Sequence, residues 1–120
     1  THTGTVAAAS NWDEPVQFMA VQPSHQDSYE RLCHDTGIGA FFLPLRYPRS
    51  QAVKERLLHP HLERAIGVIY RPKTEILSHY FHAVLPIQFD EYIWMDETQA
   101  VTPIETPRGS GVPETYPFGL

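Results

Sequence analysis

The strongest structural signal in this sequence is the apolar run Ala65-Ile66-Gly67-Val68-Ile69-Tyr70. Side chains at both odd and even positions of the run are apolar, as they are in a strand that is covered on its two faces. Strands of that kind usually lie at the centre of an α/β sheet. The run ends at Arg71-Pro72, because proline has no amide hydrogen to donate to a sheet. We therefore predict a buried central strand over residues 65–70.

Short elements are predicted on the amino-terminal side of this run. A helix is expected over residues 28–36, where Asp27 can cap the first turn and Glu30 completes a capping-box pattern. Gly37 can end this helix in a left-handed conformation. Strands are expected at 16–21 and 40–45, the second one buried, and a further helix at 51–58 with Ser50 as its cap.

The carboxyl-terminal side carries weaker signals. Residues 76–85 fit helical spacing and strict alternation equally well, and the two alternatives stay open. A short strand is expected at 92–95, followed by an acidic turn at 96–98. From Pro103 onward, four prolines and three glycines in eighteen residues predict a disordered tail, which we assign to residues 105–120.

The order of these elements favours an α/β fold, a short mixed sheet with flanking short helices. Too few elements are predicted to cover both faces of a strand at 65–70. The chain also begins with Thr1, and no basic segment followed by an apolar one precedes the first predicted element. We therefore expect residues 1–104 to be an incomplete part of a larger α/β domain.

Composition excludes several classes of partner. Fourteen acidic and nine basic side chains give a formal net charge of −5, which disfavours binding to nucleic acid or to an anionic membrane surface. No apolar run approaches the roughly 20 residues of a membrane span. Cys33 is the single cysteine, so an internal disulfide or a thiolate zinc cluster is excluded, and we expect a cytoplasmic location.

His2 is the candidate catalytic residue. It lies in Thr1-His2-Thr3-Gly4-Thr5, a segment rich in hydroxyl groups and backbone donors of the kind that lines active sites. Thr3, Gly4 and Thr5 are therefore candidate pocket residues, and Gly4 predicts a bend or a close backbone approach rather than a strand interior. The alternative is that His2 is a structural histidine with satisfied hydrogen bonds.

The other six histidines favour structural or exposed positions. His25 and His34 flank the helix at 28–36, where His34 can interact with the helix dipole. His59 and His61 are expected in an exposed loop. His79 and His82 form H-x-x-H without an acidic third ligand at helical spacing, so no metal site is predicted.

A second group of candidate pocket residues follows the predicted central strand. Arg71 would emerge at its carboxyl end, where open α/β sheets place their ligand crevices. A cation, an acid and hydroxyl groups could then meet in one pocket formed by Arg71, Glu75, Ser78, His79 and Tyr80. The alternative is a surface pair of Arg71 and Glu75 among ordinary loop residues.

Common catalytic and cofactor motifs do not occur in the sequence. It contains no G-x-S-x-G, P-loop, G-x-G-x-x-G, H-E-x-x-H or C-x-x-C pattern, so we expect no cofactor. Cys33 lacks the histidine and asparagine context of a catalytic nucleophile.

A series of motifs resembles the erythromycin esterase family in order and spacing. The matching segments are Thr1–Val6, Ala8–Asp13, Ser28–Glu30 with His34, Leu62–Pro72, Ser78–Phe81, Gln88–Asp90 and Asp96–Thr98. The run from Arg64 to Pro72 is the most specific of them, and the likeness covers roughly residues 1–104. Lys73 departs from the family pattern, which has Glu at that position.

The resemblance implies a hydrolase of macrolide lactones or related esters that needs no metal. In such proteins a histidine is thought to act as general base on a water molecule. An amino-terminal Glu/His segment and a His-Asn-x-His motif of the family have no counterpart in these residues. The chain thus looks like the carboxyl-terminal part of such an enzyme, inactive alone, whose partners are an ester or lactone substrate and the rest of the parent chain. The alternative is a non-catalytic α/β module that binds a ligand or a partner.

Overall fold

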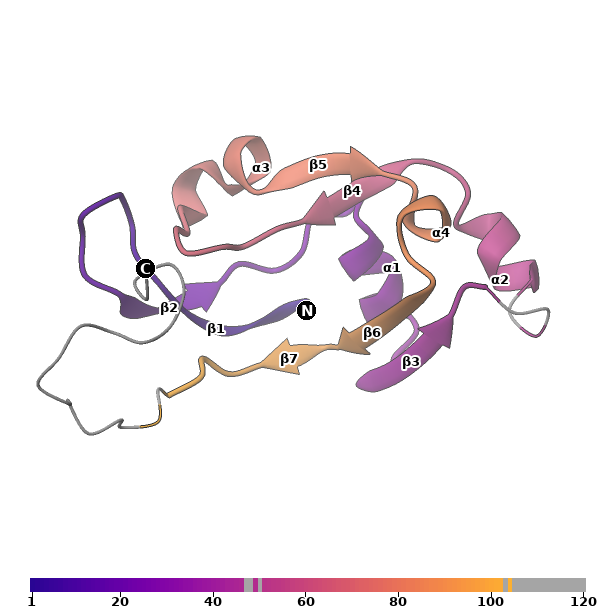
Figure 1. Cartoon of the computed structure of the whole chain (residues 1–120), viewed down its shortest axis with the longest axis horizontal. Helices are drawn as coiled ribbons and strands as arrows, with labels where there is room; N and C mark the ends of the chain where they lie inside the picture. Colours follow the sequence, from indigo (N-terminus) through magenta and orange to yellow (C-terminus); the bar gives the residue numbers. More distant parts are fainter. Residues whose placement is uncertain (47–48, 50, 103, 105–120) are drawn as a thin grey trace, which may run out of the picture.

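The computed structural model describes residues 1–46, 49, 51–102 and 104. Short strands form small sheets and alternate with short helices, which confirms the predicted α/β class. Figure 1 shows two of the strands, β4 and β5, running together along the upper part of the molecule, while β1, β7 and β6 follow one another below. The predicted tail at 105–120 lies outside the described residues.

The first sheet has the strand order β2-β1-β7. Strand β1 (Thr3–Ala8) pairs antiparallel with β2 (Gln17–Val21) and parallel with β7 (Glu97–Thr98). The prediction of a plain turn at 96–98 is therefore wrong, because Glu97 and Thr98 extend this sheet.

Gly4 lies within β1 with a φ of +135°, so the prediction that it avoids a strand interior is also wrong. A side-chain carbon at Gly4 would overlap the carbonyl oxygen of Thr98, which confirms the predicted close backbone approach.

The second sheet pairs β3 (Ala40–Pro44) with β6 (Glu91–Met95) in antiparallel register. Trp94 is buried, but Phe42, opposite Ile93, is 55% exposed. The two predicted strands are confirmed, whereas the prediction that the first is buried is wrong for its outer face. No element in the described part of the chain covers that face.

The third sheet pairs β4 (His61–Arg64) with β5 (Tyr80–Ala83). Between them the chain forms a 3-10 turn, η2 (Pro72–Thr74), and a single helical turn, α3 (Glu75–Ser78). The undecided segment 76–85 is thus a helix end followed by a strand, and a further turn, α4 (Leu85–Gln88), comes after it.

The predicted central strand at 65–70 does not form. Ala65 still donates to His79 O at 2.8 Å, but the chain then leaves β5, and Ile69 makes one isolated bridge to Ala9. Val68 is 68% exposed, and only Tyr70 is fully buried. The run is a connection that passes the end of β1. Apart from the bridge at Ile69, no described strand pairs with it, so its apolar composition does not produce a strand.

The two main helices are shorter than predicted. Helix α1 (Tyr29–Asp35) is capped by Ser28, whose side chain accepts a hydrogen bond from the Arg31 amide, so Asp27 is not the cap. Gly37 ends it at a φ of +70°, as predicted. Helix α2 (Gln51–Arg56) is also present, and its predicted cap, Ser50, lies outside the described residues.

The hydrophobic core is small and centres on Tyr29. Its ring packs with Leu45, Ala83 and Leu85. Its hydroxyl lies 3.1 Å from three backbone carbonyl oxygens and accepts from the Leu85 amide at 3.0 Å. Tyr29 therefore fastens α1 to β5, to α4 and to the end of α2.

Candidate active site

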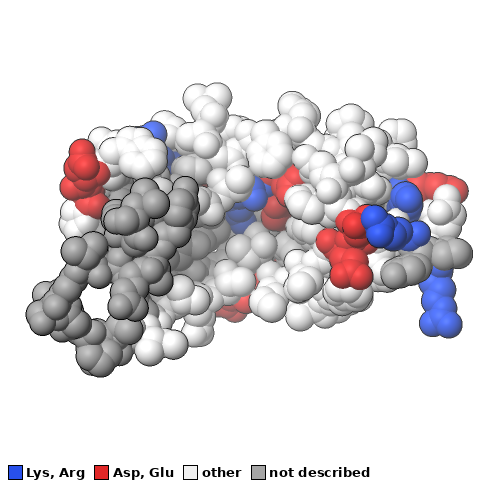
Figure 2. All heavy atoms as spheres, in the orientation of Figure 1, with Lys and Arg blue, Asp and Glu red and all other residues white. Residues whose placement is uncertain are grey.

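The centre of the site is the buried guanidinium of Arg64, at the end of β4. One nitrogen, Nη1, donates to Gln22 O at 2.7 Å and to Glu75 Oε1 at 3.1 Å. The other, Nη2, donates to the backbone oxygens of Thr1 and His2, the second at 3.0 Å. Arg64 thus holds the start of β1, the end of β2 and α3 together. Figure 2 shows basic and acidic side chains meeting in a hollow in the middle of the molecule.

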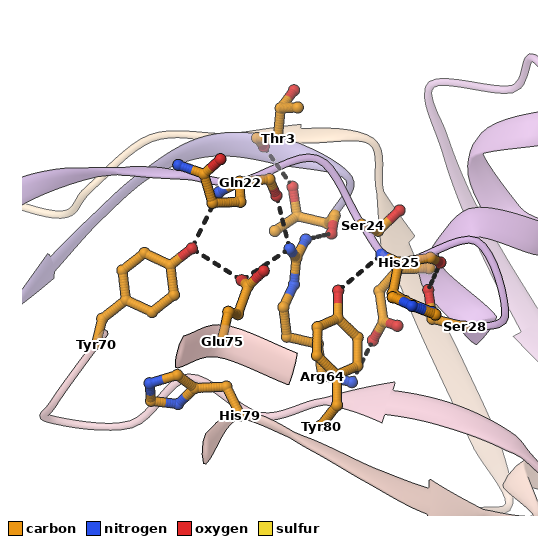
Figure 3. A network of polar contacts seen from close by, with 12 residues as sticks. Thr3, Gln22, Ser24, His25, Ser28, Arg64, Tyr70, Glu75, His79 and Tyr80 are labelled. Atoms are coloured by element: carbon orange, nitrogen blue, oxygen red, sulfur yellow. Dashed lines mark hydrogen bonds and ion pairs between the residues drawn. The ribbon is translucent and has the colours of Figure 1, made fainter. Parts of the chain in front are cut away.

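Glu75 balances the charge of Arg64. Its Oε1 also accepts the Tyr70 hydroxyl at 2.8 Å, and that hydroxyl accepts the Gln22 amide at 3.0 Å. Burial, followed by the hydrogen bond to Glu75, raises the pKa of Tyr70 to about 12, so Tyr70 remains a donor. Figure 3 shows Tyr70, Glu75 and Arg64 reaching from one side toward the segment that carries Gln22.

The anchored backbone of His2 places its ring against Ser24 and His34. The Ser24 amide and hydroxyl lie 3.3 and 2.7 Å from His2 Nδ1, so this nitrogen is the acceptor and Nε2 carries the proton. Burial, followed by the neighbouring His34, lowers the pKa of His2. A neutral His2 fits both contacts.

His34 carries the complementary tautomer. Its Nδ1 lies 2.8 Å from Asp96 Oδ1, and a carboxylate oxygen only accepts, so Nδ1 is the donor. When the ring is neutral, Nε2 is therefore the acceptor nitrogen, and no described residue makes a hydrogen bond to it. The rings of His2 and His34 stack with 3.6 Å between their centroids and 12° between their planes. An aspartate that orients a histidine with a free Nε2 is the arrangement of a general base.

Asp96 is held by the same backbone segment that Arg64 anchors. Its carbonyl oxygen accepts the amides of His2 and Thr3 at 2.8 and 3.2 Å, and its own amide donates to Gly39 O at 2.8 Å. The position of Asp96 between β6 and β7 thus depends on the pairing of β7 with β1.

Comparison with known families shows to which group of proteins the chain belongs. The family described as erythromycin esterase matches residues 1–98. The chain belongs to the erythromycin esterase family. No solved structure gave a significant match. Membership supports a hydrolase function in general, and residues 1–98 contain Arg64, His2, His34 and Asp96.

The second pocket predicted from the sequence is not assembled in this erythromycin esterase relative. Arg71 turns away from Glu75 and donates to Ser10 O at 3.2 Å and to Asn11 Oδ1 at 2.8 Å. The predicted position depended on a strand at 65–70, which does not form. Arg64, not Arg71, is the partner of Glu75, and the pair is buried rather than on the surface.

Other predicted pocket residues have mainly structural contacts. His79 accepts the Arg71 amide at Nε2 and faces Ala65 O through Nδ1, so both ring nitrogens are engaged. Ser78 is exposed and donates to Thr74 O at 2.8 Å. His79 caps α3 while His82 lies in β5, and within the described residues no group of three histidine, cysteine, aspartate or glutamate side chains could hold a metal.

The candidates beside His2 are distributed along β1. Thr3 donates its amide to Asp96 O at 3.2 Å and so lies next to the histidine pair. Gly4 contacts Thr98, and the Thr5 hydroxyl accepts the Ala100 amide at 2.9 Å. Tyr80 stands with its ring 5.7 Å from Arg64 Cζ, and its hydroxyl accepts the His25 amide at 3.0 Å.

Sequence reasoning missed Arg64, Ser24, Asp96 and the polar role of His34. His34 and Asp96 are 62 residues apart, and no local pattern connects them. The charged Arg64 at the start of an apolar run was a usable signal, since a charge there must find partners if the run is buried. Among the described helices, none has the length and apolar character that crossing a bilayer requires.

Proposed function

We propose that this chain takes part in the hydrolysis of carboxylic esters, with macrolide lactones as the substrate class. Family membership over residues 1–98 supports an ester hydrolase. The observation that carries the proposal in this chain is the His34–Asp96 pair, because Nδ1 of His34 is held by the carboxylate while Nε2 has no hydrogen-bond partner among the described residues.

In the proposed reaction, His34 Nε2 accepts a proton from the attacking water. The Asp96 carboxylate keeps the donor proton on Nδ1 and stabilises the imidazolium that forms. His2 lies flat against this ring, with its own proton on Nε2. A neutral His2 avoids a second positive charge 3.6 Å from the imidazolium, which would oppose the proton transfer.

The chain is proposed to act together with other family segments. The resemblance assigns further catalytic groups to an amino-terminal Glu/His segment and a His-Asn-x-His motif, and neither occurs in these 120 residues. Purified residues 1–120 should therefore leave erythromycin intact.

The test uses the polypeptide translated from the complete reading frame that contains these residues. Erythromycin is the probe, and the gain of one water molecule is followed by mass spectrometry. His34→Gln should lower kcat/KM by about 100-fold or more, because glutamine cannot accept the proton. Asp96→Asn should lower it as well, whereas the exposed control His59→Gln should not.

Two results would contradict the proposal. Unchanged turnover by folded His34→Gln would remove His34 from the reaction. Absence of erythromycin and simple-ester hydrolysis by the complete polypeptide would favour the non-catalytic binding module instead.

A further inference from the structure

A cleft of about 630 Å³ is lined in part by Tyr80, whose ring centroid lies 5.7 Å from Arg64 Cζ. Its walls come from the segment before α1, the start of β4, α3 and β5. The side chains that matter here are His25, Asp27, His61, Ile76, Tyr80 and His82. The proposed hydrolytic pair, His34 and Asp96, is not among the lining residues.

Several side chains that line this cleft carry hydrogen-bond donors. The Tyr80 hydroxyl accepts the His25 amide at 3.0 Å, and its own proton has no acceptor among the described residues. Burial raises the pKa of Tyr80, so the hydroxyl stays protonated. His25 Nδ1 accepts the Asp27 amide at 3.2 Å, which leaves the proton on Nε2.

Two more imidazoles complete the donor set. His61 packs edge-on against Tyr29, with 5.0 Å between the ring centroids, and His82 is exposed on β5. Within the described chain, neither ring makes a hydrogen bond. Each neutral imidazole can therefore offer one N–H to a ligand.

The remaining lining selects the charge and shape of a ligand. No lysine or arginine lines the cleft, so its lining offers no cation to balance a second negative charge on a ligand. The Asp27 side chain is 83% exposed, so solvent screens the effect of its carboxylate on a ligand with one negative charge. Ile76 and the neighbouring Pro60 and Leu62 supply apolar walls. An acceptor with one negative charge and a hydrocarbon body suits these features better than inorganic phosphate does.

We propose that this cleft is a binding site for small organic carboxylates. The carboxylate oxygens accept from Tyr80 Oη and from the imidazole N–H groups, while the hydrocarbon part packs on Ile76. The inference rests on the cleft alone and holds whether or not His34 takes part in hydrolysis.

The test titrates the 120-residue chain with benzoate and follows the histidine ring signals by NMR. The signals of His25, His61 and His82 should shift together, and those of His59 should not. His82→Leu, an exposed change, should weaken binding by about tenfold, as expected for losing a hydrogen bond to a charged group. His59→Leu is the matched control.

Further probes separate the ligand classes. Benzyl alcohol, which keeps the ring and lacks the charge, should bind at least about tenfold more weakly. Inorganic phosphate should not displace benzoate. The proposal is overturned if benzoate shifts no cleft histidine, if phosphate competes equally, or if His82→Leu and Tyr80→Phe both bind benzoate as the unmodified chain does.

Discussion

Arg64 is a buried cation whose surroundings replace its hydration. The Arg64 side chain is 2% exposed and that of Glu75 is 9% exposed. One carboxylate neutralises the charge, and three backbone carbonyl oxygens accept the other hydrogen bonds that the guanidinium donates. Such a pair adds little net stability, but removal of one member leaves a bare buried charge.

Arg64 and Arg71 therefore form a matched pair for mutation. Arg64→Met should lower the free energy of unfolding by about 3–5 kcal/mol, because Glu75 would stay buried without its cation. Arg71→Met should change it by about 0.5 kcal/mol or less, since Arg71 contacts an exposed turn. Urea unfolding followed by circular dichroism measures both. Equal losses would contradict the central place of Arg64.

Glu63 makes stability depend on pH. Burial, followed by the charge of Glu30, raises the pKa of Glu63 above its ordinary 4.5. In the described chain, Oε2 of Glu30 and Oε2 of Glu63 are both buried without a hydrogen-bond partner. The folded state holds the Glu63 proton more tightly than the unfolded state, so stability falls as pH rises from the ordinary value through the raised one.

Glu63→Gln should remove this dependence. The variant should exceed the unmodified chain in stability at neutral pH, and the difference should shrink as pH falls through the raised pKa toward 4.5. Urea midpoints between acidic and neutral pH measure the effect, with exposed Glu91→Gln as control. A variant that is less stable at neutral pH would show that the Glu63 carboxylate has a stabilising partner.

At the scale of elements, β1 connects the fold to the candidate site. Its pairing with β7 brings the His2 and Thr3 amides to Asp96 O, and Asp96 orients His34. Gly4 permits this pairing, because the two backbones approach too closely for a side chain.

Gly4→Ala should therefore separate β7 from β1. We expect a loss of more than about 2 kcal/mol in stability, from steric overlap and from the φ of +135°. Gly67→Ala is the control, since a carbon there meets nothing within 4 Å, and it should stay within about 1 kcal/mol. Thermal unfolding measures both. A Gly4→Ala protein as stable as the control would mean that β1 and β7 are not tightly paired.

At the scale of the whole molecule, apolar side chains remain uncovered. Phe42, Ile93 and Met95 on the outer face of the β3–β6 sheet are 55%, 67% and 53% exposed. Figure 2 shows broad areas without charge between scattered acidic and basic groups. Contiguous apolar surface of this kind promotes association.

The 120-residue chain should accordingly self-associate as its concentration rises. Sedimentation velocity should show an increasing average sedimentation coefficient. Ile93→Lys should reduce the increase, because a charge in the middle of the face opposes its burial. Gln99→Lys adds the same charge elsewhere and serves as control. Concentration-independent sedimentation of the unmodified chain would contradict the prediction.

Some features followed from local sequence because their causes are local. Gly37 ends α1, and alternation or apolar character identified β2, β3 and β6. The ordered motifs were sufficient to indicate the erythromycin esterase family, and the match over residues 1–98 confirms it. The choice of His2 as a site residue stays a prediction.

Only tertiary packing determined the contents of the site. The run at 65–70 has the composition of a central strand, yet strand formation needs neighbours, and a single bridge at Ile69 is what the chain provides. Arg64 pairs with Glu75 because both side chains are buried, where water cannot solvate their charges. His34 meets Asp96 across 62 residues because β1 and β7 pair, and no local propensity encodes a contact between side chains so far apart.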